Sequence, residues 1–295
     1  MRKTQGGDKP SNNMEEIEEP ELSSGSSILL GEINIFKHKR RAKMKAFRIV
    51  LAIIAISFAF ASSGLGQAGK TRGSKTKIFE GSSKSLGAGK AHTFVAIDGG
   101  GKPTTLGIVL TEATLDGLTD ADSEVVLNLP EQIAVPPYKH VVVNWNPSGH
   151  EPVNIYGVPH FDFHFYLIPE EERIAIIPGP DTTQVPQKFC PRGYFSYVYS
   201  MPKMGVHWVD SLAKELKGDP FTETFIYGFY HGNMIFLEPM MTKAYLETKP
   251  SYSSDLKLPG AYQCEGYYPI RYSIRSDPKT KKFTVSLEGL TLRKP

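Results

Sequence analysis

Short runs in which apolar and polar residues alternate fill most of the chain after residue 90. Such alternation, rich in β-branched and aromatic residues and punctuated by Gly, Pro and Asn, is typical of strands joined by turns. The pattern predicts a single mainly β domain over 91–295, an antiparallel barrel or sandwich with one or two short helices. The expected strands are 92–97, 104–110, 124–129, 140–145, 161–168, 194–200, 223–230, 233–237, 268–275 and 283–287.

Helical patterns are few. Residues 210–217 and 239–247 carry the clearest helical signal, and Pro239 suits a first helical position because its missing N–H needs no partner there. Thr111 and Gly117 fit the start and stop of one or two further helical turns.

The chain before residue 91 has a different composition. Residues 1–43 are polar, and we expect them to be disordered or an untranslated upstream segment, since Met44 opens an ordinary signal n-region. Basic residues before the apolar run 49–61, and small residues after it, predict a signal peptide over 44–68. A cytoplasmic tail before a signal anchor is the alternative.

The apolar run holds 13 residues, whereas a membrane-spanning helix needs about 20, so we expect membrane contact only during export. Cleavage near 61–68 would release a secreted or periplasmic protein. Residues 69–90, rich in Gly, Ser and Lys, are expected to form a flexible linker.

Net charge and cysteine content limit which partners and which covalent links we expect. The net charge is +3, and no basic stripe with interleaved aromatic residues follows the N-terminal block, so nucleic acid is not an expected partner. The segment GAGKA at 87–91 lacks the glycine spacing and the Ser or Thr of a phosphate loop, so nucleotide is not expected either. Cys190 and Cys264 can form one disulfide after export or remain two buried thiols.

The segment PHFDFHFY at 159–166 is the most informative about chemistry. As a strand it places three phenylalanines on one face, toward a core, and His160, Asp162 and His164 on the other. Two imidazoles and a carboxylate in a row can converge on one metal ion. Hydrogen bonding within the fold is the structural alternative for the same three side chains.

Further ligands are available elsewhere in the chain. His207 and Glu238 are the residues we expect to join the cluster, because imidazole and carboxylate together suit zinc, iron, manganese or copper. His150 lies in a turn-rich loop, where a hydrogen bond that fixes the loop is at least as expected, and His231 is assigned to a hairpin turn.

Six segments also carry a family resemblance: AHTFVAID at 91–98, 102–118, 139–166, MGVHWVD at 204–210, 221–244 and 268–292. In them the chain resembles an exported bacterial domain family of unknown function, typified by a thermophile protein under extracytoplasmic sigma-factor control. The resemblance covers essentially all of 90–293, with PHFDFHFY and MGVHW as its most specific motifs. It implies a β-rich fold and a homo-oligomer, and it implies no catalytic residues.

These observations predict an exported β-rich protein with an envelope or stress role that binds a transition metal, zinc by preference. The expected ligands are His160, His164 and His207, with Asp162 or Glu238 as an acidic ligand or as a residue that orients one. A metal-dependent hydrolase or lyase that uses the same cluster is one alternative. A metal-free protein that binds a small molecule or forms an oligomeric structure is the other.

Overall fold

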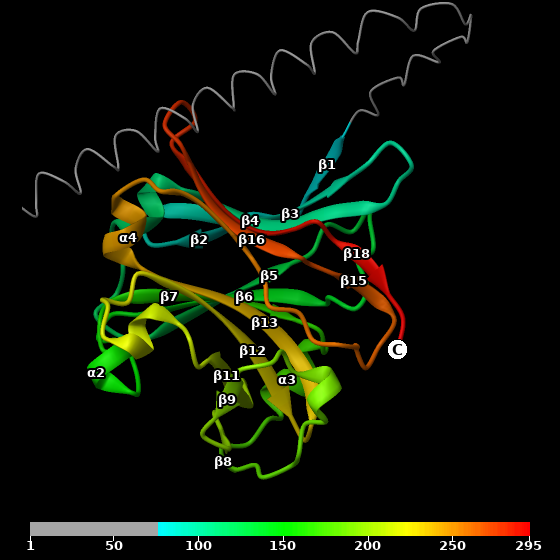
Figure 1. Cartoon of the computed structure of the whole chain (residues 1–295). Helices are drawn as coiled ribbons and strands as arrows, with labels where there is room; N and C mark the ends of the chain where they lie inside the picture. Colours follow the sequence, from blue (N-terminus) through cyan, green and yellow to red (C-terminus); the bar gives the residue numbers. More distant parts are fainter. Residues whose placement is uncertain (1–75) are drawn as a thin grey trace, which may run out of the picture. The chain divides into compact units, whose positions relative to one another are not determined.

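The computed structural model describes residues 76–295, and the predicted signal peptide and upstream segment lie outside them. Two antiparallel sheets of seven strands face each other (Figure 1). The sheets do not close, so the mainly β prediction is confirmed as a sandwich. Within the described residues no helix has the length and apolar character needed to cross a bilayer.

The upper sheet in Figure 1 has the order β1-β3-β4-β17-β16-β14, with β2 also paired to β3. We call it sheet 1. Its strands are β1 (Lys77–Glu80), β2 (Lys84–Leu86), β3 (Gly89–Ile97), β4 (Pro103–Thr111), β14 (Ser251–Asp255), β16 (Arg271–Asp277) and β17 (Lys282–Glu288).

The second sheet, sheet 2, has the order β5-β6-β7-β13-β12-β11-β9. Its strands are β5 (Ser123–Asn128), β6 (His140–Asn146), β7 (His160–Tyr166), β9 (Tyr194–Ser196), β11 (Val206–Asp210), β12 (Glu223–Tyr230) and β13 (Asn233–Thr242). Two small pairs complete the strands: β8 (Gly179–Pro180) with β10 (Tyr199–Ser200), and β15 (Gly266–Tyr268) with β18 (Thr291–Arg293).

Helical structure is confined to single turns and short helices. The α-helices are α2 (Val153–Tyr156), α3 (Glu170–Ile174) and α4 (Lys243–Glu247), and the 3-10 turns are η1 (Glu112–Leu115), η2 (Gln187–Phe189) and η3 (Lys214–Lys217). α2, α3 and β8 lie on the side of sheet 2 that faces away from sheet 1 (Figure 1).

Both faces of sheet 2 are therefore buried. Phe161, Phe163 and Phe165 pack in the main core, with residues of sheet 1 such as Ile108 and Val285, as their alternation predicts. The opposite face belongs to a second, smaller cluster that includes Tyr166 and Phe236. Because loops cover this second face, the polar face of β7 is enclosed rather than exposed to water.

Part of the expected linker is sheet instead. β1 and β2 fall within 69–90 and both pair with β3. Most side chains of these two strands are exposed at a sheet edge, where polar residues are tolerated. Their sequences are therefore rich in Lys and Ser, a composition that is also typical of a linker.

The two expected helices also differ from the structure. Residues Val206–Asp210 form β11, and only the 3-10 turn η3 remains of the helix expected at 210–217. β13 continues through Pro239, so the helix expected at 239–247 begins at Lys243. It is capped there by the Thr242 side chain, which accepts a 3.1 Å hydrogen bond from the Tyr245 backbone N–H.

The two cysteines are not bonded to each other. Cys190 is a buried free thiol in the main core, and burial raises its pKa to about 11. Cys264 is an exposed free thiol. Of the two alternatives that the sequence left open, a disulfide or two buried thiols, the structure shows two free thiols, of which only one is buried.

Candidate metal centre

The polar face of β7 carries three of the expected ligands. His160, Asp162 and His164 are each no more than 3% exposed, and all three point away from sheet 1. The structure does not gather the five expected ligands at one point. Together with His150, the five form two groups of three, each made of two histidines and one carboxylate.

The first group, which we call the inner triad, consists of His164, His207 and Glu238. These side chains come from β7, β11 and β13. The Nε2 atom of His164 lies 3.3 Å from Oε1 of Glu238, and Nε2 of His207 lies 3.5 Å from Oε2 of the same carboxylate. One carboxylate therefore faces two imidazoles, one through each oxygen.

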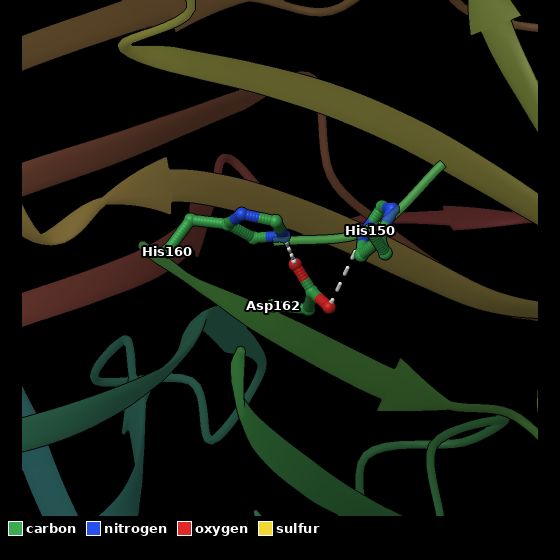
Figure 2. A group of neighbouring side chains, drawn as sticks. All are labelled: His150, His160 and Asp162. Carbon is green, nitrogen blue, oxygen red and sulfur yellow. Dashed lines mark ion pairs between the residues drawn. The ribbon is translucent and has the colours of Figure 1, made fainter. Parts of the chain in front are cut away.

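The second group, the outer triad, consists of His150, His160 and Asp162 (Figure 2). Nε2 of His160 lies 3.2 Å from Oδ1 of Asp162, and Nε2 of His150 lies 3.8 Å from Oδ2. His150 comes from the loop between β6 and α2, and its side chain is 38% exposed. It was expected to fix its loop by a hydrogen bond, and its Nδ1 does lie 2.9 Å from the Glu151 carbonyl oxygen.

The Nδ1 atoms of three of these histidines share one kind of partner, an amide carbonyl oxygen. A carbonyl oxygen only accepts, so these contacts assign the proton to Nδ1 and leave a lone pair on Nε2. The partners are Glu151 for His150 at 2.9 Å, Val158 for His160 at 2.7 Å, and the Asn144 side chain for His164 at 3.1 Å. Each Nε2 lone pair is thus presented to a carboxylate.

Burial sets the charge state of the inner triad. It lowers the pKa of His164 to about 3 and that of His207 to about 4, so both imidazoles are neutral at pH 7. Burial also raises the pKa of Glu238 well above its ordinary value, and the nearby charge of Asp162 adds to this. Without a cation the inner triad therefore disfavours charge on every member.

The outer triad behaves differently. Burial would raise the pKa of Asp162, but the neighbouring imidazole of His160 outweighs it and lowers that pKa to about 2. Burial likewise lowers the pKa of His160, but Asp162 outweighs this and the net shift is upward. Both triads include residues of β7, yet burial dominates the pKa values of the inner triad, whereas the interaction between His160 and Asp162 dominates those of the outer triad.

Two asparagines of β6 support the triads from one side. Asn146 Nδ2 donates a 2.7 Å hydrogen bond to Asp162 Oδ2, and Asn144 Oδ1 accepts from His164. Both contacts run diagonally between β6 and β7, whose register places Asn146 opposite His160. These asparagines and the place of His150 beside Asp162 were missed from the sequence, and only the alternation of β6 hints that Asn144 and Asn146 share a face.

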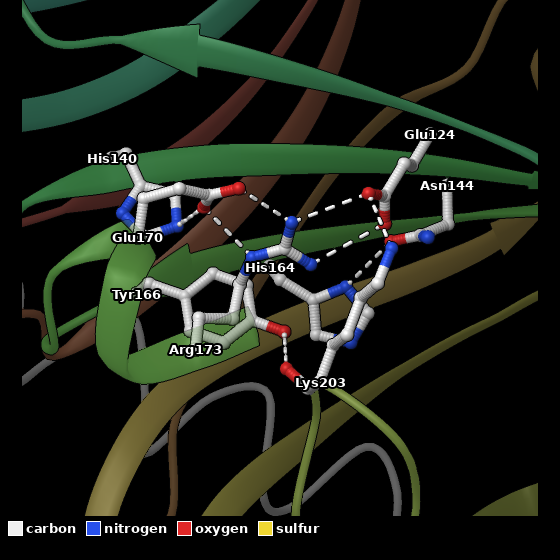
Figure 3. A network of polar contacts seen from close by, with 8 residues as sticks. All are labelled: Glu124, His140, Asn144, His164, Tyr166, Glu170, Arg173 and Lys203. Atoms are coloured by element: carbon white, nitrogen blue, oxygen red, sulfur yellow. Dashed lines mark hydrogen bonds and ion pairs between the residues drawn. The ribbon is translucent and has the colours of Figure 1, made fainter. Parts of the chain in front are cut away.

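A buried arginine fastens α3 over this face (Figure 3). The Arg173 guanidinium is 1% exposed and donates to Glu170 at 2.7 and 2.8 Å and to Glu124 at 3.3 Å. It lies over the ring of Tyr166, which in turn stacks on His164 at 5.5 Å between centroids. The network thus helps to close the cover above the inner triad.

A cavity of about 480 Å³ lies elsewhere, lined by apolar residues, by Tyr262, Tyr268 and Cys264, and by polar side chains that include Glu172 and His231. It shares no lining residue with either triad. A small molecule could bind in this cavity if the protein is a metal-free binder, but the cavity wall carries no cluster of charged groups.

Comparison with known proteins gives one match. A family model described as "TTHB210-like: Hypothetical protein TTHB210" matches residues 98–145, which hold β4, η1, β5 and most of β6. Neither the curated proteins nor the solved structures give a match. Over 98–145 the chain is therefore similar to a family of unknown function typified by a thermophile protein, and the six triad residues lie outside the matched stretch.

Proposed function

We propose that the protein binds a divalent transition-metal ion, zinc by preference, through the inner triad of His164, His207 and Glu238. Two neutral imidazoles and one carboxylate are ligands that zinc commonly takes. The observation that carries the proposal is that the nitrogen and oxygen atoms of these side chains point at one another at short distance. Nε2 of His164 and Oε2 of Glu238 are buried and have no hydrogen-bond partner among the described residues.

The spacing of the ligand atoms fits a metal ion. Zinc–ligand bonds of about 2.0–2.1 Å in a tetrahedron place neighbouring ligand atoms about 3.3 Å apart. The two contacts within the inner triad measure 3.3 and 3.5 Å. The two contacts reach different oxygens of Glu238, and the three ligand atoms lie within 4.8 Å of one another, a spacing that side-chain movement can close around an ion.

A purely structural role explains the inner triad less well. A proton on Glu238 would let this carboxyl donate to Nε2 of His164, and its other oxygen would then have a partner only if His207 carries its proton on Nε2. Leaving a buried polar atom without a partner costs about 1–3 kcal/mol. A metal ion satisfies all three ligand atoms at once.

A metal-dependent hydrolase or lyase is the second candidate, and one observation favours it. The inner triad offers three protein ligands, as catalytic zinc sites do, whereas structural zinc sites are closed by four. His207 is the most exposed of the three ligands, with a 22% exposed side chain, and the fourth coordination position would be left for water. A water bound there would become a nucleophile near neutral pH.

The test is elemental analysis of untagged protein, with a Glu238→Gln variant beside it. We expect bound zinc in the wild type and its loss at the inner triad in the variant. The matched control is Glu131→Gln, which changes an exposed glutamate away from both triads. Less than about a tenth of an equivalent of any transition metal, with no uptake of added zinc, would contradict the proposal.

We also propose that the protein acts outside the cytoplasm, in an envelope or stress role. The support is the order of basic, apolar and small residues between 37 and 68. A homo-oligomer belongs to the same proposal and rests on the family resemblance alone. N-terminal sequencing of protein from the producing cell tests export. A terminus at residue 62 or 69 is expected, and retention of the apolar run would contradict it.

A further inference from the structure

We infer that the outer triad, His150, His160 and Asp162, is a second metal site, so that the chain holds two ions on one face of sheet 2. The inference rests on the proposed metal-binding function and adds a second ion, with its own ligands, to it. Figure 2 shows both imidazoles directed at the two oxygens of one carboxylate.

The first argument is the fixed orientation of the two rings. The Nδ1 atoms of both histidines are taken up by backbone carbonyl oxygens, at 2.7 Å for His160 and 2.9 Å for His150. Both Nε2 atoms are therefore free to bind a metal, and neither ring can turn without losing a hydrogen bond. Carbonyl partners of this kind are what orient metal-binding histidines in proteins.

The second argument is burial without hydrogen-bond partners. His160 is 0% exposed and Asp162 is 3% exposed. Within residues 76–295 neither Nε2 of His160 nor Oδ1 of Asp162 has a hydrogen-bond partner. A proton on His160 would join these two atoms but leave Nε2 of His150 facing Oδ2, whereas a metal ion meets all three ligands.

The third argument is spacing. His160 lies 3.2 Å from Oδ1 of Asp162 and His150 lies 3.8 Å from Oδ2, and the three ligand atoms lie within 4.8 Å of one another, against about 3.3 Å between neighbouring ligands of tetrahedral zinc. The longer contact belongs to His150, the one ligand on a loop. A small movement of that loop would bring its Nε2 into range.

The fourth argument separates the second site from the first. Asp162 and His164 lie two residues apart on β7, which places their Cα atoms roughly 6.6 Å from each other. Each carboxylate faces its own pair of imidazoles. The six ligands therefore divide into two complete sets, and neither set needs a member of the other.

The outer site should be the more easily emptied of the two. His150 is its most exposed ligand, with a 38% exposed side chain, and sits in a loop, whereas all three inner ligands stand on strands of sheet 2. We therefore expect a chelator to remove the outer ion first.

The experiment measures zinc per chain in the untagged full chain after zinc loading and removal of excess. The variants are His150→Ala for the outer triad, Glu238→Gln for the inner triad, and both together. His150→Ala alters an exposed loop, so it should fold, and circular dichroism confirms this for each variant. His231→Ala is the matched control, since His231 faces Asp181 at 3.7 Å in an exposed turn without a third ligand.

We expect about two ions in the wild type and in the control, one in each single variant, and close to none in the double variant. One ion in the wild type that His150→Ala leaves in place would overturn the second site while the proposed function stands. One ion that either substitution removes would show a single shared site and also overturn the inference. No bound ion in the folded wild type would overturn both proposals.

Discussion

His164 and Glu238 face each other across neighbouring strands, with Nε2 3.3 Å from Oε1, at the point where Pro239 interrupts the pairing of β13 with β7. On either side of this point the two strands are paired, at Leu237 with Phe165 and at Met240 with Asp162. Proline cannot donate a hydrogen bond, so it loosens the ladder there. The inner triad thus occupies an irregular place in an otherwise regular sheet.

The asparagines of β6 should tune the two metal sites separately. Asn144→Ala removes the acceptor that orients His164, so we expect zinc affinity at the inner triad to fall roughly 10- to 100-fold. Asn146→Ala removes the donor to Asp162 and should lower affinity at the outer triad by a similar factor. Competition titration with a chromogenic chelator measures both.

Each asparagine variant is the control for the other. The same loss at both sites in both variants would mean that these substitutions disturb β6 as a whole, and would contradict separate support.

Zinc should stabilise the fold. An ion that binds the native state and not the unfolded chain, at 100 times its Kd, contributes about 2.7 kcal/mol per site. For a domain of this size that corresponds to a rise in Tm of roughly 5–11 °C for one occupied site. Scanning calorimetry with and without a chelator checks it. Glu238→Gln should lose the part of the rise that belongs to the inner triad, and an unchanged rise would contradict that assignment.

The sequence predicted the face of β7 because that information is local. Alternation over PHFDFHFY is enough to place three phenylalanines in the core and His160, Asp162 and His164 opposite them. The partners of these residues are not local. Glu238 meets His164 only through the pairing of strands more than 70 residues apart, and single-sequence patterns do not determine such registers.

His150 was placed correctly in a loop, but nothing near it in the sequence shows that this loop folds back beside Asp162. Pro239 read as a helix start because its local preference points there, yet it lies inside β13. At Pro239 strand pairing outweighed local propensity.

The core face of β7 should be separable from its metal-binding face. Phe163→Ala removes a fully buried ring between Asp162 and His164, and we expect a loss of about 3–5 kcal/mol of stability. The corresponding fall in Tm is roughly 6–20 °C. Denaturant unfolding measures the loss of stability. The control is Ile78→Ala, which changes a 58% exposed residue of β1 and should alter the free energy of unfolding by close to zero. At low temperature, where the variant stays folded, zinc content should match the wild type.

Acid should remove the contribution of Glu124 to stability. Burial would raise the pKa of Glu124, but hydrogen bonds and charge from Arg173 and Lys203 outweigh it and hold the pKa below its usual 4.5. A carboxyl with a depressed folded-state pKa stabilises the fold above the unfolded pKa and loses this effect as pH falls through the folded pKa. Glu124→Gln should therefore lower Tm at pH 7, and the gap to wild type should close below about pH 4.

Thermal unfolding from pH 7 to pH 3 checks the Glu124 prediction. The control is Glu131→Gln, which changes an exposed glutamate and should leave Tm equal to that of the wild type at both pH values. Glu170 also faces Arg173, so acid weakens this second pair in wild type and variant alike, and the difference between them reports Glu124. A difference in Tm between Glu124→Gln and wild type that is equal at pH 7 and pH 3 would mean that Glu124 acts through packing. In that case Arg173 would hold α3 over the inner triad through Glu170 alone.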